Sequence, residues 1–261
     1  MNVKFTKMTG AGNDFVLLDD RQNRFRSNDH DLVKHLCDRR FGVGADGLIL
    51  LRALPGFDFN MVYFNADGNE SSMCGNGGRC ITAFANKLGI IKNKARFMAI
   101  DGEHLAELTS TDYVRLKMND VSSIESGENF FFLNTGSPHY VTFHPSISNL
   151  DVLTEGRNIC FNERFAPEGT NVNFVEDCGD YLFVRTYERG VENETLACGT
   201  GVVAAVICAG IRKNHDKISF SLPVKVMGGL LRVSYYRMND NFTDIWLEGP
   251  ANYVFKGKIK L

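Results

Sequence analysis

The sequence contains one short motif twice, at corresponding places in its two halves. Residues 70–77 read ESSMCGNG and residues 194–201 read ETLACGTG, so a Glu, a Cys and two Gly recur at the same spacing 124 residues later. A repeat over such an interval indicates an internal duplication. We therefore expect two related domains, each containing one Cys-Gly-x-Gly turn.

The order of the predicted elements around the two motifs is also similar. Apolar runs predict strands, and apolar residues at helical spacing predict helices. In the first half we expect strands at 3–5, 15–18, 48–51 and 59–64, helices through 32–37 and 75–88, and a hairpin at 101–102. In the second half we expect strands within 130–143 and at 172–176, 181–187 and 254–259, helices near 148–155 and 199–211, and a hairpin near 228–229. Ser27 or Asn28 is the expected N-cap of the first helix.

This alternation of strands and helices predicts an α/β (α+β) protein. Turn residues place the domain boundary near residues 118–126. The first half then comprises residues 1–118 and the second half residues 119–251, and we expect a last strand, from about residue 252, to return to the first half.

Composition and charge exclude several classes of protein. The 261 residues include 29 Lys and Arg against 31 Asp and Glu, a formal net charge of −2, so no basic stripe is available for nucleic acid. The longest apolar stretch, 202–211, has ten residues, whereas a membrane-spanning helix needs about 20. The N-terminal segment is polar and glycine-rich where a secretory signal would be apolar. We expect a cytoplasmic protein without nucleic-acid or membrane partners.

The seven cysteines include no CxxC pair, which argues against both a disulfide framework and a zinc site. We expect no metal. Five of them are interpreted as small buried residues: Cys37, Cys80, Cys160, Cys178 and Cys208. Cys74 and Cys198 differ, because each lies in a duplicated glycine-flanked turn at the start of a predicted helix.

A thiol at a helix start is suited to acid–base chemistry. The unbonded N–H groups and the positive end of the helix dipole stabilise a thiolate there. The following glycines let a carboxylate approach the same amides. Two such helix starts suit inversion at a carbon with an acidic hydrogen, in which a thiolate removes the proton and a thiol returns one to the opposite face. This chemistry requires no cofactor.

Two other glycine-rich segments need interpretation. Residues 42–47 read GVGADG and fit GxGxxG, but a helix precedes them and a strand follows, the reverse of a dinucleotide-binding turn. We interpret this segment as a tight helix-to-strand turn. Residues 10–14 read GAGND and are interpreted as a loop that projects Asn13.

Six ordered motifs together resemble the diaminopimelate epimerase family, whose members use two cysteines and no pyridoxal phosphate. They are KMTGAGNDF (7–15), FGVGADG (41–47), NADGNESSMCGNGGRC (65–80), GSPH (136–139), TNVNF (170–174) and YERGVENETLACGTG (187–201). Proline racemases and a phenazine-biosynthesis isomerase share the fold but lack this combination of motifs. The resemblance covers essentially the whole chain. It implies two pseudo-symmetric domains, each a curved, mostly antiparallel sheet around a central helix.

The resemblance also implies roles for individual residues. Cys74 and Cys198 are the acid–base pair, and His139 and Glu188 support catalysis. The implied substrate-binding residues are Asn13, Asn65, Gly75, Asn76, Asn171, Glu188, Arg189, Gly199 and Thr200. From the residues alone, each asparagine could simply support a turn, Glu188 and Arg189 could be an exposed pair, and His139 could be a satisfied loop histidine.

The implied reaction is the interconversion of LL- and meso-2,6-diaminopimelate by an isomerase of lysine and peptidoglycan-precursor synthesis. A small-molecule amino-acid substrate and a homodimer are implied with it. Three features depart from the family: Ser137 replaces an Asn, Gly47 stands where some members have Gln, and residues 191–194 (VENE) lengthen a loop. Three alternatives stay open, namely an epimerase of another amino acid such as a hydroxyproline, a redox-sensing dithiol protein, and a non-catalytic amino-acid-binding protein.

Overall fold

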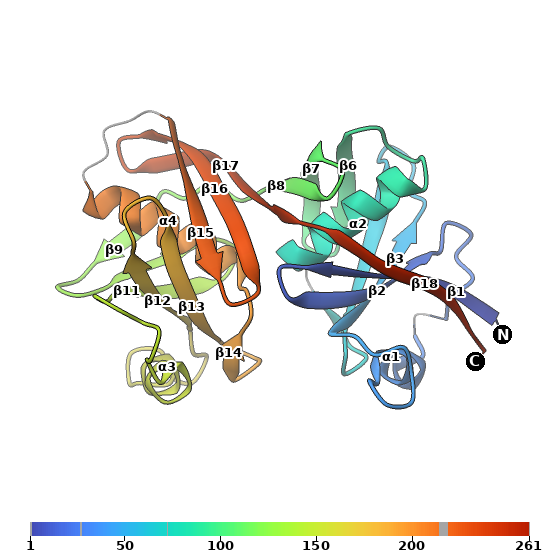
Figure 1. The fold of residues 1–261 in the computed structure, drawn as a ribbon, viewed down its shortest axis with the longest axis horizontal. Coiled ribbons are helices and arrows are strands. Elements are labelled where there is room, and N and C mark those ends of the chain that lie inside the picture. The colour runs from blue at the N-terminus through green and yellow to red at the C-terminus, as the bar shows by residue number, and fades with distance from the viewer. Residues whose placement is uncertain (1, 27, 72, 214–218, 261) are drawn as a thin grey trace. The chain divides into compact units, whose positions relative to one another are not determined.

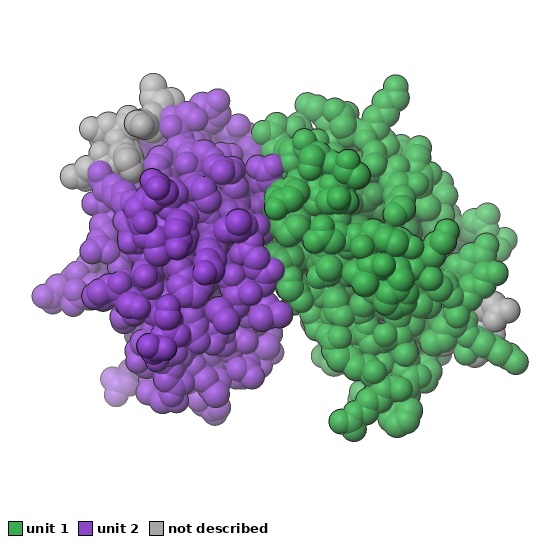
Figure 2. All heavy atoms as spheres, viewed as in Figure 1, with its two compact units in different colours: residues 1–116, 249–261 green, residues 117–248 purple. Residues whose placement is uncertain are grey.

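The structure, a computed structural model, describes residues 2–26, 28–71, 73–213 and 219–260. Contacts between Cα atoms divide the chain into unit 1, residues 1–116 with 249–261, and unit 2, residues 117–248 (Figure 2). Each unit mixes helices with strands (Figure 1), which confirms the predicted α/β (α+β) class. Within these described ranges, no helix is both long and apolar enough to span a membrane.

The described residues of unit 1 form two helices and nine strands. Its elements are β1 (Asn2–Gly10), β2 (Asn13–Asp19), α1 (His30–Cys37), β3 (Gly47–Arg52), β4 (Phe59–Asn65), β5 (Glu70–Ser71), α2 (Gly75–Lys87), β6 (Lys94–Ala99), β7 (Gly102–Ser110), β8 (Tyr113–Lys117) and β18 (Asn252–Lys260). β18 pairs antiparallel with β1, so the last strand lies in unit 1.

Unit 2 follows with a matching set of elements. They are β9 (Ile124–Ser126), β10 (Phe131–Asn134), β11 (Pro138–Phe143), α3 (Val152–Cys160), β12 (Asn171–Asp177), β13 (Leu182–Glu188), β14 (Asn193–Thr195), α4 (Gly199–Arg212), β15 (Ser219–Val226), β16 (Gly229–Met238) and β17 (Asn241–Pro250).

The two units share one order of strand pairing. In unit 1, β2 and β3 are parallel, β3 and β4 antiparallel, and β4 and β6 parallel. In unit 2, β11, β12, β13 and β15 pair in the same parallel, antiparallel, parallel order. The hairpin pairs β6–β7 and β15–β16 are antiparallel in both. The duplication that the motif predicts is therefore visible in the topology.

Each sheet is buried on both faces because a helix packs on each side. In unit 1, Leu48 and Leu50 of β3 belong to the core cluster with Val33 and Leu36 of α1. Ile49, between them, points the other way, toward Gly77 of α2. Successive strand residues face opposite sides. This explains why these strands read as continuous apolar runs.

Unit 2 repeats this layering. Val172 and Phe174 of β12 pack in one cluster with Val152 and Cys160 of α3. Asn173, between them, faces α4, where it lies against Gly201. α2 and α4 each contact several strands of their own unit and are almost entirely buried. The expected central helix in each half is confirmed.

Two predicted helix boundaries are wrong. α1 is capped by Asp29, whose carboxylate accepts a hydrogen bond from Leu32 N at 3.0 Å, and not by Asn28; Ser27 lies outside the described residues. α3 starts later than 148–155, because Asp151 caps it by accepting from Thr154 N at 3.1 Å. An Asp side chain reaches the unbonded amides of the first turn and competes well with Asn or Ser.

Candidate active site

Cys74 is the N-cap residue of α2, at the helix start that the sequence predicts. Its backbone is extended (φ −81°, ψ 127°), and its carbonyl accepts the first helical hydrogen bond from Gly78 N at 2.7 Å. The N–H groups of the three residues between them, 75–77, therefore have no partner within the helix. With the helix dipole, they favour an anion at this helix start.

Cys198 has the same position at the start of α4. Its backbone is also extended (φ −116°, ψ 107°), and its carbonyl accepts from Val202 N at 2.9 Å. Cys198 is 7% exposed, whereas Cys74 is half-buried. Gly199 and Thr200 supply the first amides of α4, as Gly75 and Asn76 do in α2. Each unit thus contains one thiol beside one anion-binding helix start.

A chain of polar side chains leads away from the start of α2. Asn76 is 2% exposed, and its Nδ2 donates to Asn13 Oδ1. Asn13 Nδ2 in turn donates to Asp46 Oδ2 at 3.0 Å. The predicted loop residue Asn13 and the helix residue Asn76 are therefore brought into direct contact, although 63 residues separate them.

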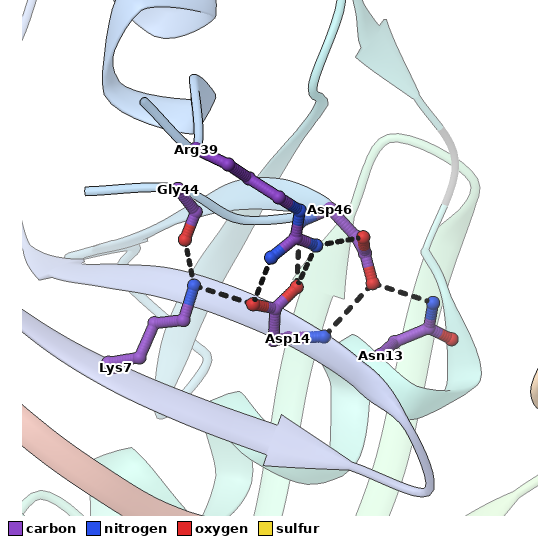
Figure 3. Close-up of polar contacts among 6 residues, drawn as sticks. All are labelled: Lys7, Asn13, Asp14, Arg39, Gly44 and Asp46. Carbon is purple, nitrogen blue, oxygen red and sulfur yellow. Dashed lines mark hydrogen bonds and ion pairs between the residues drawn. The ribbon is translucent and has the colours of Figure 1, made fainter. Parts of the chain in front are cut away.

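Asp46 belongs to a network of charged groups shown in Figure 3. Arg39 bridges Asp46 and Asp14 at 2.7 Å each, and Lys7, which is 6% exposed, contacts Asp14 at 2.8 Å and the Gly44 carbonyl. Burial by itself raises the pKa of Asp14, but hydrogen bonds from Arg39 and Lys7 outweigh it, so that the pKa lies well below its usual range. The network anchors residues 42–47, which form the predicted helix-to-strand turn.

Arg79, in the second turn of α2, is a residue of this cluster that the sequence analysis missed. It is 0% exposed, and its Nη2 donates to Asn76 Oδ1 at 2.7 Å. Burial lowers the pKa of its guanidinium, although arginine stays protonated in proteins. The signal that could have revealed it is a charged residue where the second motif has Val203, at the same distance from its cysteine.

Asn65 is the predicted binding residue that the structure does not join to this cluster. It is exposed at the end of β4, and its backbone closes a turn with Gly68 and Asn69. In the part of unit 1 that is described, its side chain makes no hydrogen bond to Asn13 or Asn76.

His139 is fully buried beside Cys198 in unit 2. Its Nε2 lies 2.9 Å from Thr200 Oγ1, and Thr200 Oγ1 lies 3.6 Å from Cys198 Sγ. Its Nδ1 accepts a hydrogen bond from Asn173 Nδ2 at 3.0 Å. Burial, with a smaller contribution from the charge of Arg189, lowers the pKa of His139 to about 3. The imidazole is therefore neutral, and its proton is on Nε2.

Glu188 lies at the end of β13 and contacts the same cysteine. Burial raises the pKa of its carboxyl, and hydrogen bonds from Thr195 and Cys198 oppose the shift. Thr195 Oγ1 donates to Glu188 Oε2 at 2.9 Å. Thr195 was not among the predicted site residues.

Asn171 connects two other predicted features of unit 2. Its Oδ1 accepts from Arg189 N at 3.0 Å, and its Nδ2 donates to Ser137 Oγ at 2.9 Å and to the Pro138 carbonyl at 3.1 Å. Asn171 therefore orients its neighbours. Ser137 Oγ also lies 3.1 Å from His139 Nε2, so this departure from the family pattern is integrated into the hydrogen-bond network.

The guanidinium of Arg189 is half-exposed and donates to the Glu168 carbonyl at 3.3 Å. Among the described residues no other acceptor is bonded to this guanidinium, so its remaining donors can bind an anion. The departure at Gly47 has a steric reason, because a Cβ there would lie 2.5 Å from Tyr63 Cε2.

The other cysteines divide into two groups. Cys37, Cys80, Cys160 and Cys208 are buried as predicted, and burial raises the pKa of each, to about 12 for Cys37 and Cys80. These thiols are unreactive. The interpretation of Cys178 as buried is wrong: it is exposed in the hairpin turn between β12 and β13, where the chain must leave the core to reverse direction.

Comparison with a solved structure defines the class of fold. A phenazine biosynthesis protein of the PhzF family from Bacillus anthracis superimposes with a TM-score of 0.78 over 100% of both chains, at 12% sequence identity. The fold is thus that of two-domain α+β proteins with duplicated halves.

Sequence comparisons identify the family within this class. The family model described as diaminopimelate epimerase matches residues 5–124 and 131–254. A diaminopimelate epimerase of Flavobacterium psychrophilum is 48% identical over 258 residues, 98% of this chain and 100% of that protein. One of Chlorobaculum tepidum is 47% identical over 264 residues, 97% and 100% of the two chains. The chain belongs to the diaminopimelate epimerase family and is an isomerase, which confirms the resemblance.

Proposed function

We propose that the protein interconverts LL- and meso-2,6-diaminopimelate, with Cys74 and Cys198 as the two bases. The observation that carries the proposal is the duplicated geometry of the cysteines in a chain of this family. Each is the N-cap residue of a buried central helix with glycines in its first turn. The product would serve lysine and peptidoglycan-precursor synthesis.

The reaction balances with two thiols and no cofactor. One cysteine, as thiolate, removes the α-hydrogen as a proton, and the electron pair of the broken C–H bond is delocalised into the α-carboxylate. The other cysteine, as thiol, delivers its proton to the opposite face of the α-carbon. The thiolate and the thiol have then exchanged places, so a proton must pass from one sulfur to the other through solvent before the next turnover in the same direction.

The helix starts stabilise the charge that develops during this step. The amides of Gly75, Asn76, Gly199 and Thr200 are donors aimed by the backbone, so they need no reorganisation when the carboxylate gains negative charge. Asn13 extends the donor set at α2. Preorganised donors of this kind typically contribute about 3 kcal/mol each to the lowering of a barrier.

We assign different roles to the remaining residues. His139 and Glu188 act on Cys198: His139 orients Thr200 toward the sulfur, and the Glu188 carboxyl hydrogen-bonds with the thiol. Arg189 binds the distal carboxylate as a multiple hydrogen-bond donor. Asn171 holds Arg189 and Ser137 in position. Asn65, exposed at the end of β4, binds the distal part of the substrate.

The first test is NMR of LL- and meso-diaminopimelate in D2O, following α-deuterium uptake and the ratio of stereoisomers. Wild type should exchange and invert, and Cys74→Ser and Cys198→Ser should each lose inversion. Cys178→Ser, at the exposed cysteine, is the matched control and should retain full activity. Absence of exchange in wild type would refute the substrate assignment. Full inversion by either active-site variant would refute the two-thiol mechanism.

We further propose that the protein acts in the cytoplasm as a homodimer. The family resemblance supports this. Light scattering after size exclusion should give about twice the chain mass of 29.2 kDa. A monomeric mass for the active enzyme would contradict the dimer.

A further inference from the structure

Arg79 is a buried cation that pairs with no carboxylate among the described residues of unit 1. Its three hydrogen bonds go to neutral oxygens: Nη2 to Asn76 Oδ1 at 2.7 Å, Nη1 to the Gly75 carbonyl at 3.3 Å and Nε to the Pro250 carbonyl at 3.4 Å. None of the ion pairs formed by the described residues includes it. Burying a charge without a carboxylate beside it is costly, and the groups whose charge acts on Arg79 are the Cys80 and Cys74 thiols, so this arrangement calls for a functional explanation.

Packing of the helix does not require an arginine here. Val203 takes the corresponding position of α4, 124 residues later, and is equally buried. An apolar side chain is therefore compatible with a central helix at this position. The difference between the two helices lies in what the side chain contacts.

The guanidinium determines the orientation of two amides. It can only donate hydrogen bonds, so the atom of Asn76 that faces it must be Oδ1. Nδ2 of Asn76 then donates to Asn13 Oδ1, and Nδ2 of Asn13 donates to Asp46. The Asp46 carboxylate, paired with Arg39, can only accept. Arg79 at one end of this row of side chains and Asp46 at the other thus require the same direction of hydrogen bonding.

This direction decides what the two asparagines present to a ligand. Each amide oxygen already accepts from its neighbour in the chain, while each amide nitrogen uses one of its two N–H groups. No described residue accepts from the second N–H of Asn13 or Asn76. With the helix-start amides of α2, these N–H groups form a set of donors. Such a set favours a carboxylate over an ammonium.

We propose that Arg79 is a positioning residue that, together with Asp46 at the opposite end, holds the amide orientation of Asn76 and Asn13, so that their remaining N–H groups are available to the substrate carboxylate at the α2 helix start. The inference rests on the proposed function for the identity of the ligand. The orientation of the amides does not depend on the proposed function.

The test compares three variants by steady-state kinetics with LL-diaminopimelate and by thermal unfolding. Arg79→Met keeps the bulk of the side chain and removes the donors. We expect KM to rise at least tenfold, with a smaller change in kcat, while Tm stays the same or rises because an unpaired buried charge is gone. Arg79→Lys retains one cationic donor and should recover part of the lost affinity.

Thr82→Val is the matched control. Thr82 is buried in the next turn of α2 and donates only to the Gly78 carbonyl, so its loss leaves the asparagine chain intact. We expect its KM to equal that of wild type. If Arg79→Met keeps the wild-type KM, or if its KM rises only together with a fall in Tm, Arg79 has a structural role only and the proposal fails.

A second measurement separates this proposal from the proposed function. The side-chain amide signals of Asn76 and Asn13 can be identified in 15N–1H spectra by their disappearance in Asn76→Asp and Asn13→Asp. In ligand-free protein they should shift in Arg79→Met and stay in place in Thr82→Val. Unchanged signals in Arg79→Met would refute the positioning role. If wild type does not act on diaminopimelate but the signals shift, the proposed function falls and the positioning role stands.

Discussion

His139 Nε2 and Thr200 Oγ1 lie 2.9 Å apart and join strand β11 to the first turn of helix α4. Asn173 Nδ2 donates both to the Tyr140 carbonyl and to His139 Nδ1, so Nδ1 is an acceptor. The imidazole proton is then on Nε2 and is donated to Thr200. The Thr200 hydroxyl has its own proton left for Cys198 Sγ, 3.6 Å away. The buried Asn173 thus determines, through His139 and Thr200, that the Thr200 hydroxyl donates to the Cys198 thiol.

Replacing Asn173 with Asp should reverse this direction. A carboxylate accepts the proton of His139 Nδ1, and Nε2 becomes an acceptor for the Thr200 hydroxyl. Cys198 then loses its donor. We expect kcat to fall by about tenfold or more, roughly 1.4 kcal/mol, with little change in KM. Thr142→Val, at the other end of β11, is the control. A wild-type kcat for Asn173→Asp would exclude this role.

The neutral state of His139 should make the stability of unit 2 depend on pH. The folded pKa is about 3, below the ordinary value of 6.5, so the unfolded chain binds the proton more tightly. This contribution is fully present above pH 6.5 and is lost as the pH falls toward 3, by about 1.4 kcal/mol per pH unit. The difference in unfolding free energy between wild type and His139→Gln should therefore shrink between pH 7 and pH 4. A difference that is constant with pH would show that folding does not lower the pKa of His139.

The pH dependence of catalysis should be bell-shaped, because one thiolate and one thiol are needed together. A negative charge next to a thiol disfavours its ionisation, and Glu188 contacts Cys198. Glu188→Gln should therefore move the alkaline limb of kcat/KM to lower pH. The measurement is the full profile of both proteins at constant ionic strength. An alkaline limb that does not move would place Glu188 outside the titrating unit.

Gly201 and Gly77 hold equivalent positions in the two helices but differ in their surroundings. A Cβ at Gly201 would lie 2.2 Å from Asn173 Oδ1, whereas one at Gly77 would lie 3.1 Å from the end of the Ile49 side chain. We expect Gly201→Ala to lower the free energy of unfolding by roughly 1–3 kcal/mol and Gly77→Ala to lower it by less. Urea unfolding of both variants is the measurement. Equal losses would show that the Asn173 contact is not restrictive.

The sequence by itself determined the elements whose signals are local. The duplicated motif located the starts of α2 and α4 at Cys74 and Cys198, because an irregular polar segment directly before apolar residues at helical spacing indicates a helix start. Local patterns were less reliable for the N-cap residues of helices. Several polar residues precede each helix within a few positions, and the sequence does not show that Asp29 and Asp151 are the ones that cap. Cys178 was misinterpreted too, although its neighbours Asp177, Gly179 and Asp180 indicate a turn, and turns lie at the surface.

The tertiary structure decided which side chains meet. Asn13 and Asn76 are 63 positions apart, and Asn173 reaches His139 over 34. These contacts depend on strand register and on which face of a strand each residue occupies, and a shift of one residue would reverse both. The direction of the hydrogen bonds then follows from groups that can only donate or only accept, Arg79 and Asp46 in unit 1 and the Tyr140 carbonyl in unit 2. That polarity exists only once the chain has folded, because it belongs to pairs of residues and to no single one.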